Sequence, residues 1–185
     1  MQNIMKLILV GDSNVGKSSF MEMFLNNRFT SDAHFTIGVD YGSKQIIHNN
    51  NKTTIRIWDT AGQESYRSIV DIYFRNTQGA LLLFNLTDRS TFHNAFNIWL
   101  PKLVDNSIPF ILVGNKCDQK AVVSSEEIKY KCQEHNIIYI EASAKEDINV
   151  DQSFIKMISL IESLQLDQNN TQSIIPIRST KKCCL

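Results

Sequence analysis

The sequence predicts a doubly wound α/β domain, built on a mostly parallel six-stranded sheet with one antiparallel hairpin strand. Two observations predict this class. Short, nearly continuous apolar runs alternate with amphipathic stretches of helical period, as in a parallel sheet covered by helices on both faces. One further pair of segments flanks a run of three asparagines and has the pattern of a hairpin.

The expected strands follow directly from these runs. Residues 4–10, 80–86, 110–113 and 137–140 are the apolar runs, and we expect them to form buried parallel strands. Residues 39–48 and 52–58 lie on either side of the asparagine run, and we expect them to form the hairpin.

Helices are expected between these strands. Residues 92–103 and 150–161 each repeat apolar side chains at i, i+4, i+7, i+8 and i+11, the pattern of an amphipathic helix. Ser124 and Glu127 have the spacing of a capping box, which predicts another helix running to about His135.

The chain of 185 residues has the length of one domain. We expect that domain at residues 1–166 and a flexible tail at residues 167–185, because the helical period stops near Leu166 and the remainder is polar. The formal net charge of zero argues against nucleic-acid binding through bulk charge. No run approaches 18 apolar residues, and the N-terminal run reads as a strand and not as a signal peptide, so we expect the chain to stay in the cytosol. We also expect a monomer.

The segment from Gly11 to Ser18 reads GDSNVGKS and fits the pattern G-x-x-x-x-G-K-[ST] between an expected strand and an expected helix. Its glycines allow a turn whose N–H groups point at phosphate oxygens, and the following helix directs its positive end at the same anion. Lys17 is expected to neutralise the β- and γ-phosphates, and the Ser18 hydroxyl to bind Mg²⁺. The expected phosphate-binding residues are Asp12, Ser13, Asn14, Val15, Gly16, Lys17, Ser18 and Ser19.

Three further segments follow expected strands and point to a guanine nucleotide. The Asp118 carboxylate can accept two hydrogen bonds from guanine, a donor pair that adenine lacks. Asp59 can hold Mg²⁺ through water, the Gly62 N–H can meet a γ-phosphate, and Gln63 can orient the attacking water. The expected residues around the base are Asn115, Lys116, Asp118, Ser143, Ala144 and Lys145.

With these motifs in register, the chain resembles a small GTPase of the Ras superfamily, in its Rab branch, over about residues 4–165. The resemblance implies the P-loop GTPase type of fold. It also implies that Thr36 binds Mg²⁺ and the γ-phosphate, and that Phe29 packs against guanine. Asn14 stands where the loop of the family usually has glycine. The effector-binding residues that the resemblance implies are Ile37, Gly38, Val39, Asp40, Tyr41, Trp58 and Tyr73.

The last five residues, KKCCL, do not form a C-a-a-X box but resemble the double-cysteine ends of Rab proteins, which implies two prenyl groups on Cys183 and Cys184. Two lipids hold a protein to a membrane far more firmly than one. The resemblance further implies effectors, an activating protein, an exchange factor, a prenylation escort and a GDP-dissociation inhibitor. The expected location is the cytoplasmic face of an intracellular membrane, with cycling through the cytosol.

The expected function is therefore that of a membrane-tethered switch that binds GTP or GDP with Mg²⁺, hydrolyses GTP slowly and recruits effectors in vesicle trafficking. Two other classes remain open at this stage. A metabolic P-loop kinase is disfavoured by the residues at 115–118 and 143–145, and a GTP-dependent binding module without useful hydrolysis is disfavoured by Gln63.

Overall fold

A computed structural model describes residues 3–30, 39–60 and 72–172, and the side chains of all but the first and the last six of these. The strands form one sheet in the order β2-β3-β1-β4-β5-β6, in which only β2 is antiparallel to its neighbour. Their bounds are β1 Asn3–Val10, β2 Val39–His48, β3 Asn51–Thr60, β4 Gly79–Asn85, β5 Phe110–Asn115 and β6 Tyr139–Glu141. The predicted class and the antiparallel hairpin are confirmed.

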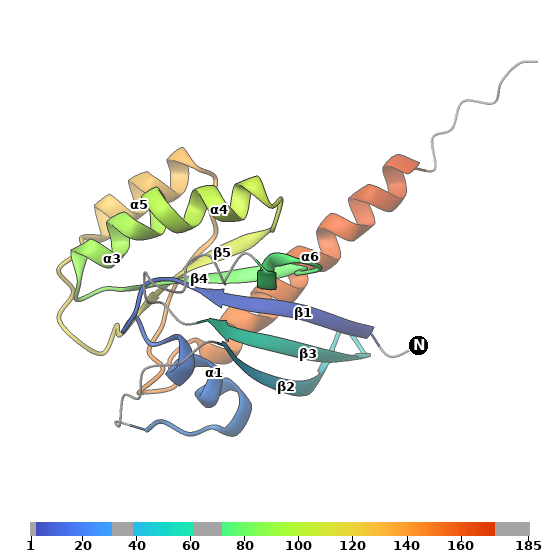
Figure 1. The fold of residues 1–185 in the computed structure, drawn as a ribbon, viewed down its shortest axis with the longest axis horizontal. Helices are drawn as coiled ribbons and strands as arrows, with labels where there is room; N and C mark the ends of the chain where they lie inside the picture. Colours follow the sequence, from blue (N-terminus) through green and yellow to red (C-terminus); the bar gives the residue numbers. More distant parts are fainter. Residues whose placement is uncertain (1–2, 31–38, 61–71, 173–185) are drawn as a thin grey trace, which may run out of the picture.

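Helices cover both faces of this sheet (Figure 1). Helices α1 and α6 lie on one face, and the segment α3-η2-α4 lies with α5 on the other (Figure 1). Their bounds are α1 Lys17–Asn26, α3 Arg89–Asn94, η2 Ala95–Trp99, α4 Leu100–Asp105, α5 Ser125–Glu134 and α6 Val150–Gln172.

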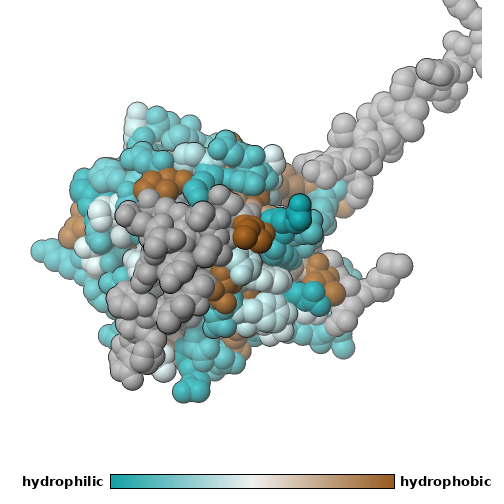
Figure 2. Space-filling view, in the orientation of Figure 1, coloured by the Kyte–Doolittle hydropathy of each residue, from teal (hydrophilic) through white to brown (hydrophobic). Residues whose placement is uncertain are grey.

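Each face of the sheet has its own apolar core. All seven residues of β4 are buried, as expected for a central strand covered on both sides. One core places Phe24 and Phe154 in a stacked ring pair between α1 and α6, and the other centres on Phe84, Phe92 and Trp99. The outer surface shown in Figure 2 is mainly hydrophilic where described residues are drawn, with separate apolar patches.

The hairpin turn is tight because Asn49 and Asn50 both have positive φ, 49° and 62°. Two such residues make the type of turn whose twist matches that of paired strands, and asparagine tolerates this conformation better than most residues. His48 then pairs with Asn51. This turn fixes the register that places Tyr41 opposite Trp58.

Local hydrogen bonds explain two boundaries. The Ser124 side chain accepts from the Glu127 N–H and begins α5 as predicted. At the other end of α5, Asn136 has a φ of 52° and the Ile137 N–H bonds back to the Cys132 carbonyl at 2.8 Å. Because Ile137 serves to end the helix, β6 begins two residues later than its apolar run predicted.

Helix α6 extends past the residue at which its apolar period stops. It continues to Gln172, six residues beyond Leu166, the last residue before the expected tail. In Figure 1 it runs out from the body of the domain as a long rod. The apolar period ends where the helix leaves the sheet, because only packed residues need to be apolar. Among the described residues, none of the helices has the length and apolar character needed to cross a membrane.

Candidate functional site

The loop between β1 and α1 crosses the carboxyl edge of the sheet in an unusual backbone conformation. Gly11, Asn14 and Gly16 have φ values of 141°, 63° and 94°. A Cβ atom at Gly11 would collide with the Leu83 carbonyl oxygen, and one at Gly16 with the Asn115 amide. The two glycines are therefore required by space as well as by φ, while asparagine can adopt the conformation at position 14.

Lys17 lies inside this loop with only 6% of its surface exposed. Its Nζ donates to the main-chain carbonyls of Gly11 at 3.0 Å and Asp12 at 2.8 Å. Burial lowers the pKa of Lys17 to about 8, although the nearby carboxylates of Asp59 and Asp12 favour its charged form. The ammonium group is thus held at a fixed position in a buried site.

Ser18 at the start of α1 and Asp59 at the end of β3 bring together two oxygen atoms that could bind a metal ion. The Ser18 hydroxyl donates to Asp59 Oδ2, and Asp59 is fully buried. Mg²⁺ binds oxygen ligands, typically one or two from the protein and the rest from water and phosphate. The chemistry of this pair fits such an ion.

Asn115 ties three loops together at the end of β5. Its Nδ2 donates to the Val15 carbonyl at 2.8 Å, and its Oδ1 accepts from the Ala144 N–H at 3.1 Å. The side chain is 1% exposed, so both polar ends need these partners. One amide thereby fixes the phosphate loop relative to the segment after β6.

Asp118 and Lys116 are held by the same neighbouring loops. The Ser143 hydroxyl donates to Asp118 Oδ1 at 2.6 Å and accepts from the Glu146 N–H at 3.1 Å. Lys116 Nζ donates to the Asn14 carbonyl at 2.9 Å, and burial lowers the pKa of Lys116. The carboxylate of Asp118 is therefore oriented, and the lysine stem lies across the phosphate loop.

The other sequence-predicted residues of the site are less constrained. Ser13 and Ser19 are half-buried, Phe29 is exposed after α1, and Lys145 is exposed and paired with Glu146. The remaining predicted residues lie outside the described part of the chain: Thr36, Ile37, Gly38, Gly62, Gln63, Cys183 and Cys184.

A second predicted feature, the aromatic surface, is assembled on β2, β3 and the segment before β4. The rings of Tyr41 and Trp58 meet edge to face with centroids 4.9 Å apart, and Tyr41 is 51% exposed. Lys6 lies over Trp58 at 4.9 Å and donates to the Tyr73 carbonyl at 2.7 Å. Val39 and Asp40 continue the same strand edge toward the site. Sequence reasoning missed Lys6, because no motif marks a lysine that bridges separate segments.

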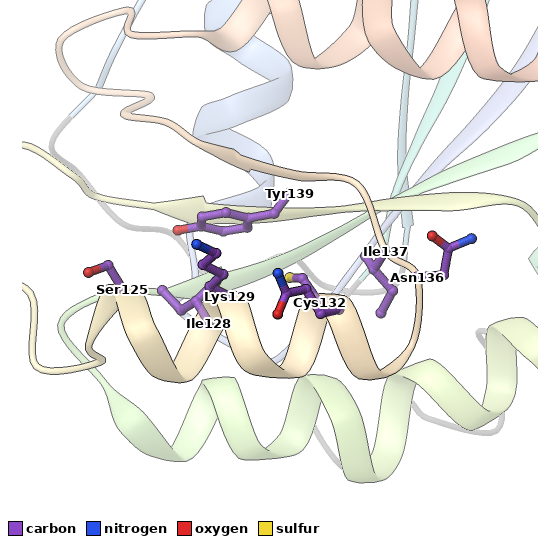
Figure 3. A pocket seen from close by; sticks show the side chains of 8 residues that line it. Ser125, Ile128, Lys129, Cys132, Asn136, Ile137 and Tyr139 are labelled. Carbon is purple, nitrogen blue, oxygen red and sulfur yellow. The ribbon is translucent and has the colours of Figure 1, made fainter.

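A pocket of about 300 Å³ lies elsewhere, between α5 and β6 (Figure 3). None of the sequence-predicted site residues lines it. Cys132 and Tyr139 point toward it in Figure 3, and burial raises the pKa of the Cys132 thiol to about 11. At neutral pH that thiol is protonated, so it is a poor nucleophile or metal ligand.

Comparison with known proteins identifies the family of this chain. The model of the Ras family matches residues 6–163. GTP-binding protein ypt3 of Schizosaccharomyces pombe is 39% identical over 163 residues, which cover 85% of this chain and 76% of the relative. Ras-related protein Rab-8B of Dictyostelium discoideum is 36% identical over 190 residues, covering 98% and 93%. Rab-2B of the same organism is 39% identical over 160 residues, covering 84% and 79%.

A P-loop at the carboxyl edge of a doubly wound sheet, together with these matches, shows that the chain belongs to the Ras family of small GTPases. Within that family its relatives place it in the Rab branch, as a guanine-nucleotide-binding GTP hydrolase of vesicle trafficking. The kinase and the inactive binding module are thereby set aside.

The buried ammonium gives a prediction for the nucleotide-free protein. The folded-state pKa of Lys17, about 8, lies below the ordinary value of 10.5, so between these values the unfolded chain binds more protons. The stability of the wild type should therefore rise with pH across this window, by about 3 kcal/mol relative to Lys17→Met. Urea unfolding of both proteins between pH 7 and 10.5 measures this difference.

Lys145→Met, which removes an exposed lysine, is the matched control for loss of a positive charge. A difference between wild type and Lys17→Met that does not change with pH would show that the Lys17 ammonium is not desolvated.

Proposed function

We propose that this site binds GTP and GDP with Mg²⁺ and hydrolyses GTP, and that the bound nucleotide switches a membrane-tethered protein between two states. The observation that carries the proposal is the pair of hydrogen bonds made by the Asn115 side chain. These bonds hold the phosphate loop and the segment after β6 together at the carboxyl edge of the sheet. That edge is where doubly wound sheets bind nucleotides.

The phosphates would lie in the loop of Gly11 to Ser18. The N–H groups of the loop and of the first turn of α1 supply donors, and the Lys17 ammonium supplies a full positive charge in a buried setting. Phosphate charge would raise the pKa of Lys17 again, so that nucleotide binding and lysine protonation favour each other. The residues contributing backbone or side-chain contacts would be Asp12, Ser13, Asn14, Val15, Gly16, Lys17, Ser18 and Ser19.

The base would be selected at Asp118. Its carboxylate accepts from the guanine N1–H and the exocyclic amine, and Ser143 keeps it in position. Ala144 and Lys145 would back the base through their main chain, the Lys116 stem would cover one face, and Phe29 would pack nearby. Adenine would leave the carboxylate without its donors, which is costly in a site built to bond them.

Ser18 and Asp59, with Thr36 from the segment before β2, would hold Mg²⁺. When bound, the ion would neutralise charge on the phosphate oxygens. Gln63 would orient the attacking water, and Lys17 would stabilise charge that develops on the transferred phosphoryl group. Turnover would be slow until an activating protein supplies an arginine, a contribution of about 10³–10⁵ in rate.

The switch would rest on Thr36 and the Gly62 N–H, which would contact the γ-phosphate and release it on hydrolysis. Effectors would bind the surface formed by Ile37, Gly38, Val39, Asp40, Tyr41, Trp58 and Tyr73. There the exposed Tyr41 ring, packed against the half-buried Trp58, offers apolar contact. An exchange factor, a prenylation escort and a GDP-dissociation inhibitor would complete the cycle. Prenylated Cys183 and Cys184 would hold the protein on the cytoplasmic face of an intracellular membrane.

The base-selection step is tested by Asp118→Asn. The asparagine Nδ2 repels the guanine amine but can donate to the O2 carbonyl of xanthine, while Oδ1 still accepts from N1–H. We expect the variant to bind GDP about 100-fold more weakly and to prefer the xanthine nucleotide. Competition between labelled GDP, ATP and xanthosine diphosphate measures this.

Asp105→Asn, which removes an exposed carboxylate at the end of α4, is the control and should behave as wild type. Wild-type protein that holds ATP as tightly as GTP would overturn the assignment of the base site.

Hydrolysis is tested by Gln63→Leu. Leucine cannot orient water, so single-turnover GTP hydrolysis should fall about tenfold or more while GTP affinity stays the same. Gln45→Leu, the same change at an exposed position of β2, is the control and should hydrolyse normally. Equal rates in all three proteins would remove Gln63 from the mechanism.

Membrane attachment is tested by replacing Cys183 and Cys184 with serine, singly and together, in an N-terminally tagged protein expressed in its own cells. One lipid gives marginal binding, so each single variant should be partly cytosolic and the double variant fully so. A double variant that remains on membranes would rule out the lipid anchor.

A further inference from the structure

The side chain of Asp12 has partners that the phosphate-loop pattern does not explain. Trp99 Nε1 donates to Asp12 Oδ1 at 2.9 Å, and Asn94 Nδ2 donates to Oδ2 at 2.7 Å. Trp99 is fully buried and Asp12 is half-buried. Hydrogen bonds to a carboxylate are stronger than neutral ones, especially away from water. Each oxygen of Asp12 is therefore fixed to the helical segment that follows β4.

Both donors reach Asp12 because this segment contains a π-turn. Asn94 and Trp99 are five residues apart, so on an α-helix of about 3.6 residues per turn their side chains would point about 140° apart. The segment Ala95–Trp99 is instead π-helical, and the Leu100 N–H bonds to the Ala95 carbonyl. A turn that closes over five residues places side chains five apart on nearly the same face. The π-turn thus presents the amide and the indole together.

Pro101 supplies a local reason for the π-turn. It has no N–H to donate to the carbonyl four residues earlier, and its ring would press on that carbonyl in a regular α-helix. Widening the preceding turn relieves this conflict. The apolar period of residues 92–103 predicted an uninterrupted helix and so gave no sign of the Asp12 contacts.

Asp12 also holds Lys17, through its main chain. Its carbonyl oxygen accepts from Lys17 Nζ at 2.8 Å, beside the Gly11 carbonyl at 3.0 Å. The same residue is thus bound by its side chain to η2 and by its backbone to the phosphate-binding lysine. Movement of η2 relative to the sheet would therefore move the Asp12 carbonyl, which positions the Lys17 ammonium.

We propose that Asp12 is a positioning residue. Its carboxylate, held by Trp99 and Asn94, fixes the position of the Asp12 backbone. The Asp12 carbonyl in turn directs the Lys17 ammonium, and so the contact with η2 influences nucleotide affinity. The inference rests on the proposed nucleotide site but adds an element, η2, that supplies none of the nucleotide contacts proposed above. This anchoring role differs from a purely electrostatic role, in which the charge of Asp12 would act on Lys17 at a distance.

The two roles respond differently to Asp12→Asn and Asp12→Ala. Asparagine keeps an acceptor for Trp99 and, with the Asn94 amide turned over, a donor for Asn94, but it has no charge. Alanine removes both the charge and the anchor. Trp99→Phe keeps a large buried ring and the charge of Asp12 but removes the indole donor.

The experiment measures the release rate and affinity of fluorescent GDP for these variants and for the Asp12→Ala/Trp99→Phe double variant. Denaturant unfolding is recorded in parallel. Leu103→Val, a buried substitution on α4 away from the loop, controls for general loss of stability. Wild-type binding of GDP is measured first, because its failure would overturn the proposed function and not the anchor.

We expect Asp12→Ala and Trp99→Phe each to bind GDP about tenfold more weakly, and Asp12→Asn to lose clearly less affinity than Asp12→Ala. Leu103→Val should stay within about twofold of wild type. The double variant should be no weaker than Asp12→Ala alone, because both changes break one interaction. Loss in Asp12→Asn equal to that in Asp12→Ala would overturn the anchor in favour of charge. Additive losses in the double variant, or normal binding by Trp99→Phe, would also overturn it.

Discussion

The arrangement of the site depends on one buried amide. Asn115 sits at the end of β5, where its side chain meets the carbonyl of Val15 and the N–H of Ala144. A buried amide without partners is costly, so each bond holds the other loop in place. The same amide occupies the space that a Cβ at Gly16 would need, which links the glycine of one motif to the asparagine of another. The loops are therefore one interlocked structure and not independent binding elements.

The positive charge of Lys17 is stabilised by carbonyl oxygens and carboxylates together. Lys17 is almost fully buried, and desolvation by itself favours its neutral form. Two main-chain carbonyls and the carboxylates of Asp12 and Asp59 oppose that effect only in part. A buried ammonium held in this way lowers the stability of the empty protein and raises its affinity for an anion. Such a cost is common at functional sites, because the groups that bind a ligand are only partly satisfied without it.

The aromatic surface and the phosphate loop share one structural feature: in each, a single side chain connects segments that are far apart in the sequence. Lys6 connects β1 to Trp58 and to the main chain at Tyr73, and Asp12 connects the phosphate loop to Trp99. Each of these contacts spans more than 50 positions of the sequence, so no local sequence pattern indicates it. Under the proposed function, both are contacts through which a change at the site could reach other elements.

The sequence by itself determined which apolar runs form strands, the hairpin and the placement of each motif after a strand, because burial on both faces and tight turns leave strong local patterns. It misjudged the ends of β6 and α6, where a helix-terminating hydrogen bond and a helix that outlasts its packed face are decided by neighbours. Only the tertiary structure showed that the Asn115 side chain bonds to two loops and that Lys17 is desolvated. It also showed that a π-turn directs the side chains of Asn94 and Trp99 toward Asp12. These features arise from contacts between segments far apart in the chain, whose geometry exists only once the sheet and its helices have packed.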